Sequence, residues 1–231
     1  METLLRGGLE ALGLPTEGVP ALLRYAELLT EKNKVMNLTA ITDPAGIATL
    51  HFLDSAALLN LAELQGRSVV DVGTGAGFPG LPLRILEPSI RLTLLESLNK
   101  RIDFLREVCG ELGLSDVACV HGRAEEFAAD HRESFDLAVS RAVASLPMLA
   151  ELCLPLVRVG GRFLAMKSVD SGEELSAAAK ALQTLGGAVE DVRDYEIPGT
   201  DVRHRLVLIK KTAETPKKYP RAFAKIKKNP L

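Results

Sequence analysis

The chain has 231 residues, of which 47% are hydrophobic and 25% are charged, and its formal net charge is −2. This composition is typical of a globular domain with room for a small accessory unit, and no apolar run approaches the ~18 residues that cross a bilayer. The N-terminus lacks the basic-then-apolar layout of a signal peptide, and the three cysteines at 109, 119 and 153 form no CxxC motif and cannot all pair with one another. We therefore expect a cytoplasmic protein with buried structural thiols and no membrane contact.

Positive charge gathers at the C-terminal end. Residues 202–231 hold ten Lys or Arg and one acid, a local charge of +9, whereas the rest of the chain holds 18 basic and 29 acidic side chains. A basic end on an acidic body predicts a polyanionic partner, with nucleic acid as the first candidate. A solubilising tail is the alternative interpretation.

Residues 1–64 predict a small helical unit. Apolar residues recur at helical spacing up to Leu12 and again over Val19–Lys34. Asp43 followed by Pro44 is typical of the start of a third helix. His51 and Asp54 of that helix are three residues apart, so they share a face.

The stretch from residue 69 to residue 82 has the pattern of a buried strand, a glycine-rich turn and the first turn of a helix. Glycines at 73, 75, 77 and 80 allow a tight turn and let a ligand approach bare N–H groups. The helix N-terminus would add a partial positive charge. The stretch therefore predicts a nucleotide-type cofactor site.

Two cofactors fit this stretch. Gly75–Gly80 matches the spacing of the dinucleotide fingerprint, which favours a nicotinamide-dependent oxidoreductase. The earlier turn at Gly73 favours S-adenosylmethionine, and so does Asp71, whose carboxylate at the strand end can reach a cationic ligand. A second strand ends in Glu96, roughly 20 residues further on, where an acid holds a ribose hydroxyl.

From Ser68 onward, strand and helix patterns alternate, which indicates an α/β fold with a mostly parallel sheet and helices on both faces. Seven strands are expected, over residues 69–72, 90–96, 117–121, 135–140, 162–166, 189–197 and 203–209, with a turn at Gly160 and Gly161 before the fifth. The last two are close in sequence and should be antiparallel. We divide the chain into a helical unit (1–64), a cofactor domain (65–211) and an extended basic arm (212–231).

In open parallel sheets the ligand lies at the carboxyl ends of the strands. Besides the glycine turn and Glu96, the residues expected there are Ala124, Glu125, Arg141 and Lys167. Arg141 is best placed to hold a substrate or cofactor group, and a salt bridge to an acid is its alternative. Glu125 fits a helix N-terminus equally well, and Lys167 fits a strand-end lysine that reaches solvent.

The motifs that are missing narrow the chemistry. The sequence has no P-loop, no Gly-x-Ser-x-Gly elbow, and no metal-ligand spacing among its four histidines. After the fourth strand, the segment expected of methylases that act on exocyclic amines is missing, and Cys153 lies in an apolar helix rather than at the site. A purine N7 fits what remains, because its lone pair carries no proton and transfer to it needs only alignment and electrostatics.

Several stretches together resemble the glucose-inhibited division protein B family: Asn37–Ile41, His51–Ser55, Asp71–Gly80, Ser140–Leu146, Phe163–Lys167 and Tyr219–Arg221. The resemblance runs from about residue 20 to the end. It implies a Rossmann-like class I methyltransferase fold and transfer of methyl from S-adenosylmethionine to N7 of one guanine in 16S (small-subunit) ribosomal RNA. Residues 222–224 depart from the Gly and Pro often found in relatives.

The resemblance also implies cofactor contacts at Gly73, Phe78, Ala124, Glu125 and Arg141, to which the residue pattern adds Asp71, Gly75 and Glu96. Arg141 is the one residue that we expect to act in catalysis. RNA contacts are expected from basic residues around the site and on the arm: Lys100, Arg101, Lys167, Arg203, Lys217, Lys218 and Arg221.

In this family context, His51 and Asp54 are expected to hold the helical unit against the cofactor domain or to contact RNA. The partner is ribosomal RNA or an assembling small subunit, bound by a monomer without a metal. A cofactor-sensing RNA-binding assembly factor that transfers no methyl group is the non-enzymatic alternative.

Overall fold

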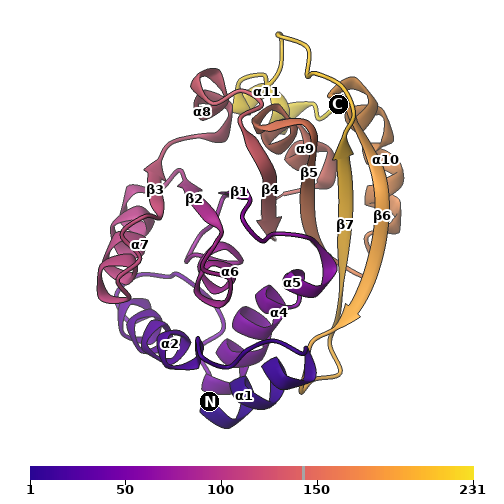
Figure 1. The fold of residues 1–231 in the computed structure, drawn as a ribbon. Coiled ribbons are helices and arrows are strands. Elements are labelled where there is room, and N and C mark those ends of the chain that lie inside the picture. Colours follow the sequence, from indigo (N-terminus) through magenta and orange to yellow (C-terminus); the bar gives the residue numbers. More distant parts are fainter. Residues whose placement is uncertain (142–143) are drawn as a thin grey trace.

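A computed structural model describes residues 1–141 and 144–231. Ala142 and Val143, which belong to one of the stretches that carry the family resemblance, lie outside the described residues. The centre of the molecule is a seven-stranded sheet in the order β3-β2-β1-β4-β5-β7-β6, with helices on both faces (Figure 1). Strands β1 to β5 are parallel to one another, and β7 is antiparallel to both β5 and β6. The predicted α/β fold is thus confirmed.

The strands are β1 (Ser68–Val72), β2 (Arg91–Glu96), β3 (Ala118–His121), β4 (Phe135–Arg141), β5 (Val157–Ser168), β6 (Gly187–Glu196) and β7 (Arg203–Lys211). The helices before the sheet are α1 (Glu2–Ala11), α2 (Val19–Asn33), α3 (Pro44–Gly46), the π-helical η1 (Ile47–Leu53), α4 (Asp54–Ala56) and α5 (Leu58–Leu61). The later ones are α6 (Gly80–Leu86), α7 (Asn99–Glu111), α8 (Ala124–Asp130), α9 (Leu146–Cys153), the 3-10 turn η2 (Leu154–Leu156), α10 (Gly172–Thr184) and α11 (Phe223–Lys228). Among the described residues, no helix has both the length and the apolar character needed to cross a membrane.

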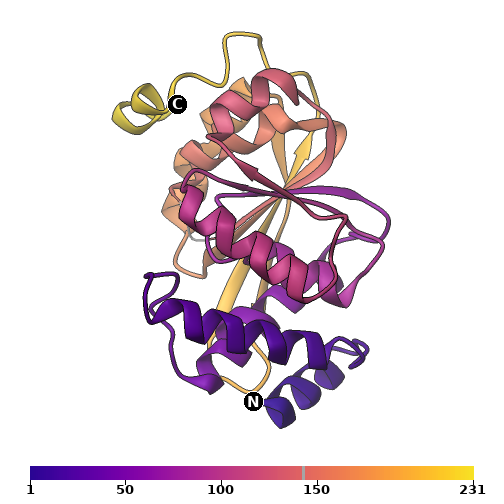
Figure 2. The same ribbon diagram turned by 90° about the vertical axis from the view of Figure 1, so that its left-hand side faces the viewer.

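The sheet separates two hydrophobic cores, because side chains alternate between its faces. On one face, residues such as Val69 and Leu94 pack with the N-terminal helices, α6 and α7. On the other face, residues such as Val70 and Leu95 pack with α8, α9, α10 and α11. Figures 1 and 2 show the N-terminal helices (indigo to purple) at one end of the molecule. They share a continuous core with the sheet.

The helical start at Asp43 is confirmed, since the Asp43 carboxylate accepts the Gly46 N–H at 2.7 Å. The segment that follows is a wider helix than the α-helix expected from the sequence. Residues 47–53 form a π-helix, a rare geometry that occurs often at functional sites. This segment carries His51, which is only 8% exposed, and leads directly to Asp54, which is completely buried.

The prediction of a turn at Gly160 and Gly161 is wrong. Both glycines lie inside β5, which begins at Val157. The β4–β5 pairing steps from Phe135↔Val157 to residues 137↔162, so β5 advances five residues where β4 advances two. The extra residues form a bulge, which needs glycine because Gly160 has a φ of +88° and a Cβ on Gly161 would overlap the Asp136 carbonyl. Glycine pairs inside a strand can therefore be mistaken for a turn.

The expected extended arm is also corrected. After β7, the chain passes over the end of the sheet and turns back, so that α11 lies beside α9 (Figures 1 and 2). Tyr219 and Ile226 are buried in the second core. Arg221 forms a double hydrogen-bonded ion pair with Glu151, at 2.8 and 2.6 Å. These apolar anchors are too sparse to produce a visible period in the sequence.

The bulge in β5 can be tested with two matched glycine substitutions. In Gly161→Ala the new Cβ meets backbone and lies 2.7 Å from Val157 Cγ1, so we expect unfolding free energy to fall by about 1–3 kcal/mol. Gly110→Ala in α7 adds a Cβ with no neighbour within 4 Å, and it should raise stability by about 0.5–1 kcal/mol. Urea titration measures both values, and equal effects of the two substitutions would contradict the close approach at Gly161.

Candidate active site

The strand order reverses between β1 and β4, which is where open α/β sheets bind ligands, beyond the carboxyl ends of the strands. Two pockets lie there. The larger, about 480 Å³, is formed by the glycine loop, the N-terminal unit, the end of β2 and Arg141. The smaller, about 130 Å³, is formed by the ends of β1 and β2, the loop after β3, α9 and α11. Gly73 and Ser97 line both, so the two pockets are neighbouring parts of one site.

The glycine loop uses its own N–H groups, contrary to the expectation that they face a ligand. The N–H of Gly73 bonds to the Leu95 carbonyl, and those of Gly77 and Phe78 bond to the Thr74 carbonyl. Helix α6 begins only at Gly80, and the Gly80 N–H donates to Asp71 at 2.9 Å. A dinucleotide site needs such donors for the pyrophosphate, and most of the donors of this loop are already bonded within the protein.

Asp71 lies beneath the loop rather than in the pocket, which corrects its predicted cofactor contact. It is completely buried, and its Oδ2 accepts hydrogen bonds from the Thr74 hydroxyl at 2.6 Å and from the Gly80 N–H. Burial raises the pKa of Asp71 to about 6, even though these two bonds favour the charged form. Asp71 therefore braces the loop, and its charge acts on the site from below.

Glu96 lies at the wall of the larger pocket, as predicted. Its carboxylate accepts the Gly75 N–H and the Leu98 N–H, both at 3.0 Å, and Arg101 lies 3.3 Å away. The side chain is 4% exposed. Glu96 thus ties the glycine loop to the end of β2, and it presents negative charge at the junction of the two pockets.

Arg141 joins the sheet to the helical unit. Its Nη1 donates to the Leu50 carbonyl and to Asp54, both at 2.9 Å, and its Nη2 lies 3.1 Å from Nδ1 of His51. The other Asp54 oxygen accepts hydrogen bonds from Tyr195 and His204. The salt bridge that was the alternative interpretation of Arg141 is therefore found, and the same side chain also lines the pocket.

These contacts fix the protonation of His51 and Asp54. Because a guanidinium can only donate, His51 Nδ1 accepts from Arg141, and the proton sits on Nε2, 2.7 Å from the Thr39 hydroxyl. Burial, followed by the charge of Arg141, lowers the pKa of His51 to about 4. Burial would raise the pKa of Asp54, but the His204 hydrogen bond and Arg141 outweigh it and keep that pKa below its usual value.

Phe78 forms an aromatic wall of the larger pocket. Its ring stacks on His51 with 4.4 Å between centroids and on Tyr25 with 5.4 Å. The guanidinium carbon of Arg141 lies 5.1 Å from the ring centre. The Tyr25 hydroxyl donates to the Ala76 carbonyl, so the N-terminal unit also holds the glycine loop. Phe78 is only 5% exposed, so the stacked rings support the wall of the pocket beside a neutral imidazole.

The remaining predicted residues fall into three groups. Ala124 and Glu125 line the smaller pocket, and Arg101 lines the larger one. Lys167 and Arg221 are held in ion pairs, with Glu174 and Glu151 respectively, so we no longer count them as RNA contacts. The exposed candidates are Lys100, Arg203, Lys217 and Lys218.

Several residues that line the two pockets were not predicted from the sequence, among them Thr39, Leu152 and Phe223. Thr39 was part of a resemblance stretch without a role, and it lines the larger pocket and bonds to His51. Leu152 and Phe223 line the smaller pocket. The only signal for Phe223 was an aromatic residue placed among lysines, which indicated nothing about its position in the fold.

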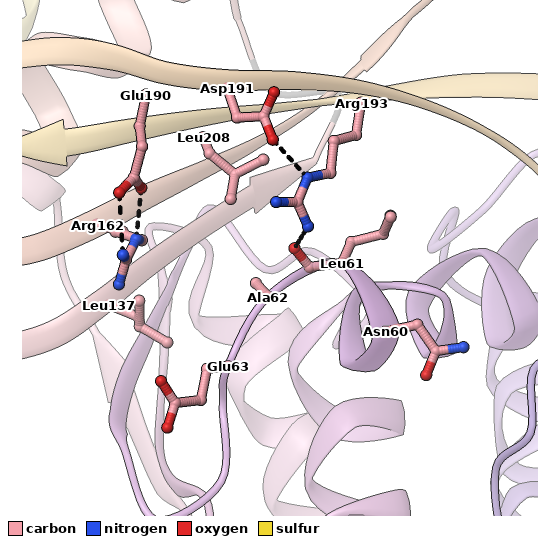
Figure 3. Close-up of a pocket in the computed structure, with 10 residues that line it drawn as sticks. All are labelled: Asn60, Leu61, Ala62, Glu63, Leu137, Arg162, Glu190, Asp191, Arg193 and Leu208. Atoms are coloured by element: carbon pink, nitrogen blue, oxygen red, sulfur yellow. Dashed lines mark hydrogen bonds and ion pairs between the residues drawn. The ribbon is translucent and has the colours of Figure 1, made fainter.

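Another pocket, about 380 Å³, lies toward the amino-terminal ends of the strands (Figure 3). Its arginines are paired, Arg162 with Glu190 and Arg193 with Asp191, and Arg193 also donates to the Leu61 carbonyl (Figure 3). These charges neutralise one another within the wall. Over residues 1–141 and 144–231, no group of three or more His, Cys, Asp or Glu side chains could hold a metal ion.

Solved structures show the same architecture. The chain is similar to TrmN from Thermus thermophilus (24% identity, TM-score 0.53, 68% of this chain and 48% of that one). It is also similar to a precorrin-6y C5,15-methyltransferase from Geobacter metallireducens (17% identity, TM-score 0.54, 68% and 87%). The sheet order and the site at its reversal point thus define a class I methyltransferase fold.

Sequence comparisons identify the family. The model of the GidB family, rRNA small subunit methyltransferase G, matches residues 19–203. Curated proteins named ribosomal RNA small subunit methyltransferase G are 49% identical in Clostridium botulinum (90% of this chain, 89% of the relative) and 45% identical in Acetivibrio thermocellus (100% and 97%). The chain belongs to this family, which confirms the resemblance found in the sequence.

The buried neutral state of His51 predicts a pH dependence of stability. Between pH 6.5 and about 4 the unfolded state binds a proton at this residue and the folded state does not, so acidification lowers the unfolding free energy, by up to about 3 kcal/mol. Asp71, with its pKa raised to about 6, has the opposite slope. We therefore expect the stability advantage of wild type over His51→Gln to shrink from pH 7 to pH 4 in urea titrations. A constant difference would contradict the assignment.

Proposed function

We propose that this protein transfers a methyl group from S-adenosylmethionine to N7 of a guanine in small-subunit ribosomal RNA. Family membership confirms the enzyme class expected from the sequence and removes the nicotinamide alternative. The N7 acceptor is the finer part of the proposal. It is supported by the protonation states and hydrogen bonds around the larger pocket.

The pockets fit the cofactor. The acids Glu96 at the pocket junction and Asp71 beneath the loop favour a ligand with an ammonium and a sulfonium. Most N–H donors of the loop are already bonded, which leaves few for a pyrophosphate, a group that S-adenosylmethionine does not contain. Glu96 would hold the ribose hydroxyls, Ala124 and Glu125 would border the adenine, and Gly73, Gly75 and Phe78 would line the rest.

Among the residues that the structure describes, no free general base lies in the wall of the larger pocket, and this single observation supports N7 most strongly. Among the described residues, the titratable side chains there are His51, Glu96, Arg101 and Arg141. Both nitrogens of His51 are hydrogen bonded and its pKa is lowered to about 4. Glu96 is bonded through both oxygens to backbone N–H groups. An acceptor that must lose a proton would find no base to remove it, whereas guanine N7 carries a lone pair and no proton.

When bound, the cofactor would supply an activated methyl group on its sulfonium, which the N7 lone pair would accept without a proton transfer. The chain's residues would align the acceptor and keep water out. Arg141 uses three of its five N–H donors internally and lines the pocket, so it can donate to a substrate or cofactor oxygen.

RNA would bind to exposed basic side chains, with Arg101 at the pocket wall. The exposed residues are Lys100, Arg203, Lys217 and Lys218. The protein would act as a monomer. The substrate would be the ribosomal RNA or an assembling small subunit, and the place of action the cytoplasm.

The acceptor atom is tested by transfer of radiolabelled methyl to undermodified small subunits and to their deproteinised RNA, followed by nucleoside analysis. We expect the label in 7-methylguanosine. Label in an exocyclic-amine product would overturn the N7 proposal and leave the family function intact. RNA and cofactor binding without transfer to either substrate would favour the assembly-factor alternative.

The role of Arg141 needs a double substitution, because removing it alone leaves Asp54 as an uncompensated buried charge, at a cost of about 3–5 kcal/mol. We expect Arg141→Gln combined with Asp54→Asn to fold and to lose roughly 100-fold or more in turnover. The matched control is Asp54→Asn alone, which keeps the guanidinium. Equal turnover in the control and the double variant would remove Arg141 from the catalytic group.

A further inference from the structure

The smaller pocket has a wall that comes from the far end of the chain. Most of its lining belongs to the ends of β1 and β2 and to the loop after β3, but Phe223, the first residue of α11, completes it. Phe223 is about 150 residues after Gly73 in sequence, and both line this pocket. The last segment of the chain therefore takes part in the site at the carboxyl ends of the strands.

Phe223 is held in this position from two sides. The guanidinium carbon of Arg123, in the loop after β3, lies 5.3 Å from the centre of the Phe223 ring. One turn further along α11, Ile226 is completely buried against the second core. Phe223 itself remains partly exposed, so one part of the ring packs on the protein and the rest is available to the pocket.

The residues just before Phe223 are held to the protein by stronger contacts. The Arg221 side chain and backbone N–H bind the carboxylate of Glu151, which is completely buried. Arg132 donates to the carbonyls of Thr215 and Tyr219, and the Tyr219 ring is buried. This series of contacts fixes the path of the segment and leaves Phe223 little freedom. The wall is therefore organised before any ligand binds.

The chemistry of the smaller pocket suits a flat heterocycle. Its side walls are apolar, from Val72, Leu95, Leu152 and Phe223, and the carboxylate-bearing Glu125 lies at the rim. Apolar and aromatic faces stack on a purine, while an acid can accept from an exocyclic amine. The pocket joins the larger one at Gly73 and Ser97, so a nucleoside can extend from one to the other.

We propose that Phe223 is a cofactor-binding residue that packs against the adenine ring, and that the C-terminal segment thereby completes the adenine end of the S-adenosylmethionine site. This inference rests on the proposed cofactor. It assigns to the segment a role that its positive charge alone does not suggest, since the aromatic ring, not a lysine, meets the cofactor.

The test is equilibrium binding by calorimetry with two probes. S-adenosylhomocysteine carries the whole cofactor frame, and 5′-methylthioadenosine carries the adenosine without the amino acid. We expect Phe223→Ala to lower the affinity for both probes by the same factor, about tenfold, because the lost contact lies at the adenine that the probes share. Phe223→Tyr keeps a ring and should bind both probes within about twofold of wild type.

Phe127→Ala is the matched control, since Phe127 lies on the neighbouring α8, stacks on His131 and does not line the pocket. It should lower the melting temperature without changing either affinity. Arg221→Gln combined with Glu151→Gln releases the anchor without leaving a buried charge, and it should weaken both probes as Phe223→Ala does.

Unchanged affinities in Phe223→Ala would overturn the inference while leaving the proposed function in place. So would a loss confined to S-adenosylhomocysteine, because it would locate the contact at the amino acid end. If wild type bound neither probe under conditions in which it is folded, the proposed function itself would fail, and the inference with it.

Discussion

The ion pair between Arg141 and Asp54 is the contact on which the site depends. It joins the last residue of β4 to the helical unit and lies entirely inside the protein on the carboxylate side. Around it, His51 is held neutral and Tyr195 and His204 satisfy the second Asp54 oxygen. A buried pair of this kind is weak evidence for stability, but it specifies one arrangement, because any other leaves a charge uncompensated. The helical unit is thus positioned as one wall of the substrate pocket.

In the glycine loop, too, polar groups are hydrogen bonded within the protein. Most of its N–H donors are satisfied by Leu95, Thr74, Glu96 and Asp71. The loop is therefore rigid without a ligand, and recognition falls to side chains that surround it. This explains how a glycine spacing shared with dinucleotide sites can serve a different cofactor: the spacing determines the shape of the turn, whereas the hydrogen bonds determine what it can bind.

Alternating strand and helix patterns were enough to predict the fold, and they placed Arg141 at the sheet edge where it lines the larger pocket. Periodicity failed where glycines form a bulge inside β5 and where a few anchors, such as Tyr219 and Ile226, direct the final segment. The roles of single side chains were harder to predict from the sequence. Asp71 and Lys167 lie at strand ends as the pocket residues do, but Asp71 is buried beneath the loop and Lys167 is paired with Glu174. Phe223 could not be predicted at all, since its contacts come from residues about 70 to 150 positions earlier.

The pairing of Glu151 with Arg221 links folding to the end of synthesis. The two residues are 70 positions apart, and the only hydrogen bonds that Glu151 makes within the described chain come from Arg221. At 5–20 residues per second, α9 emerges roughly 4–14 s before its counter-ion is made. During that interval the Glu151 carboxylate lacks its counter-ion, so burying it costs free energy and closure of the core around α9 is disfavoured. We expect a nascent chain cut short before residue 221 to pack this half of the molecule less stably than the full chain does.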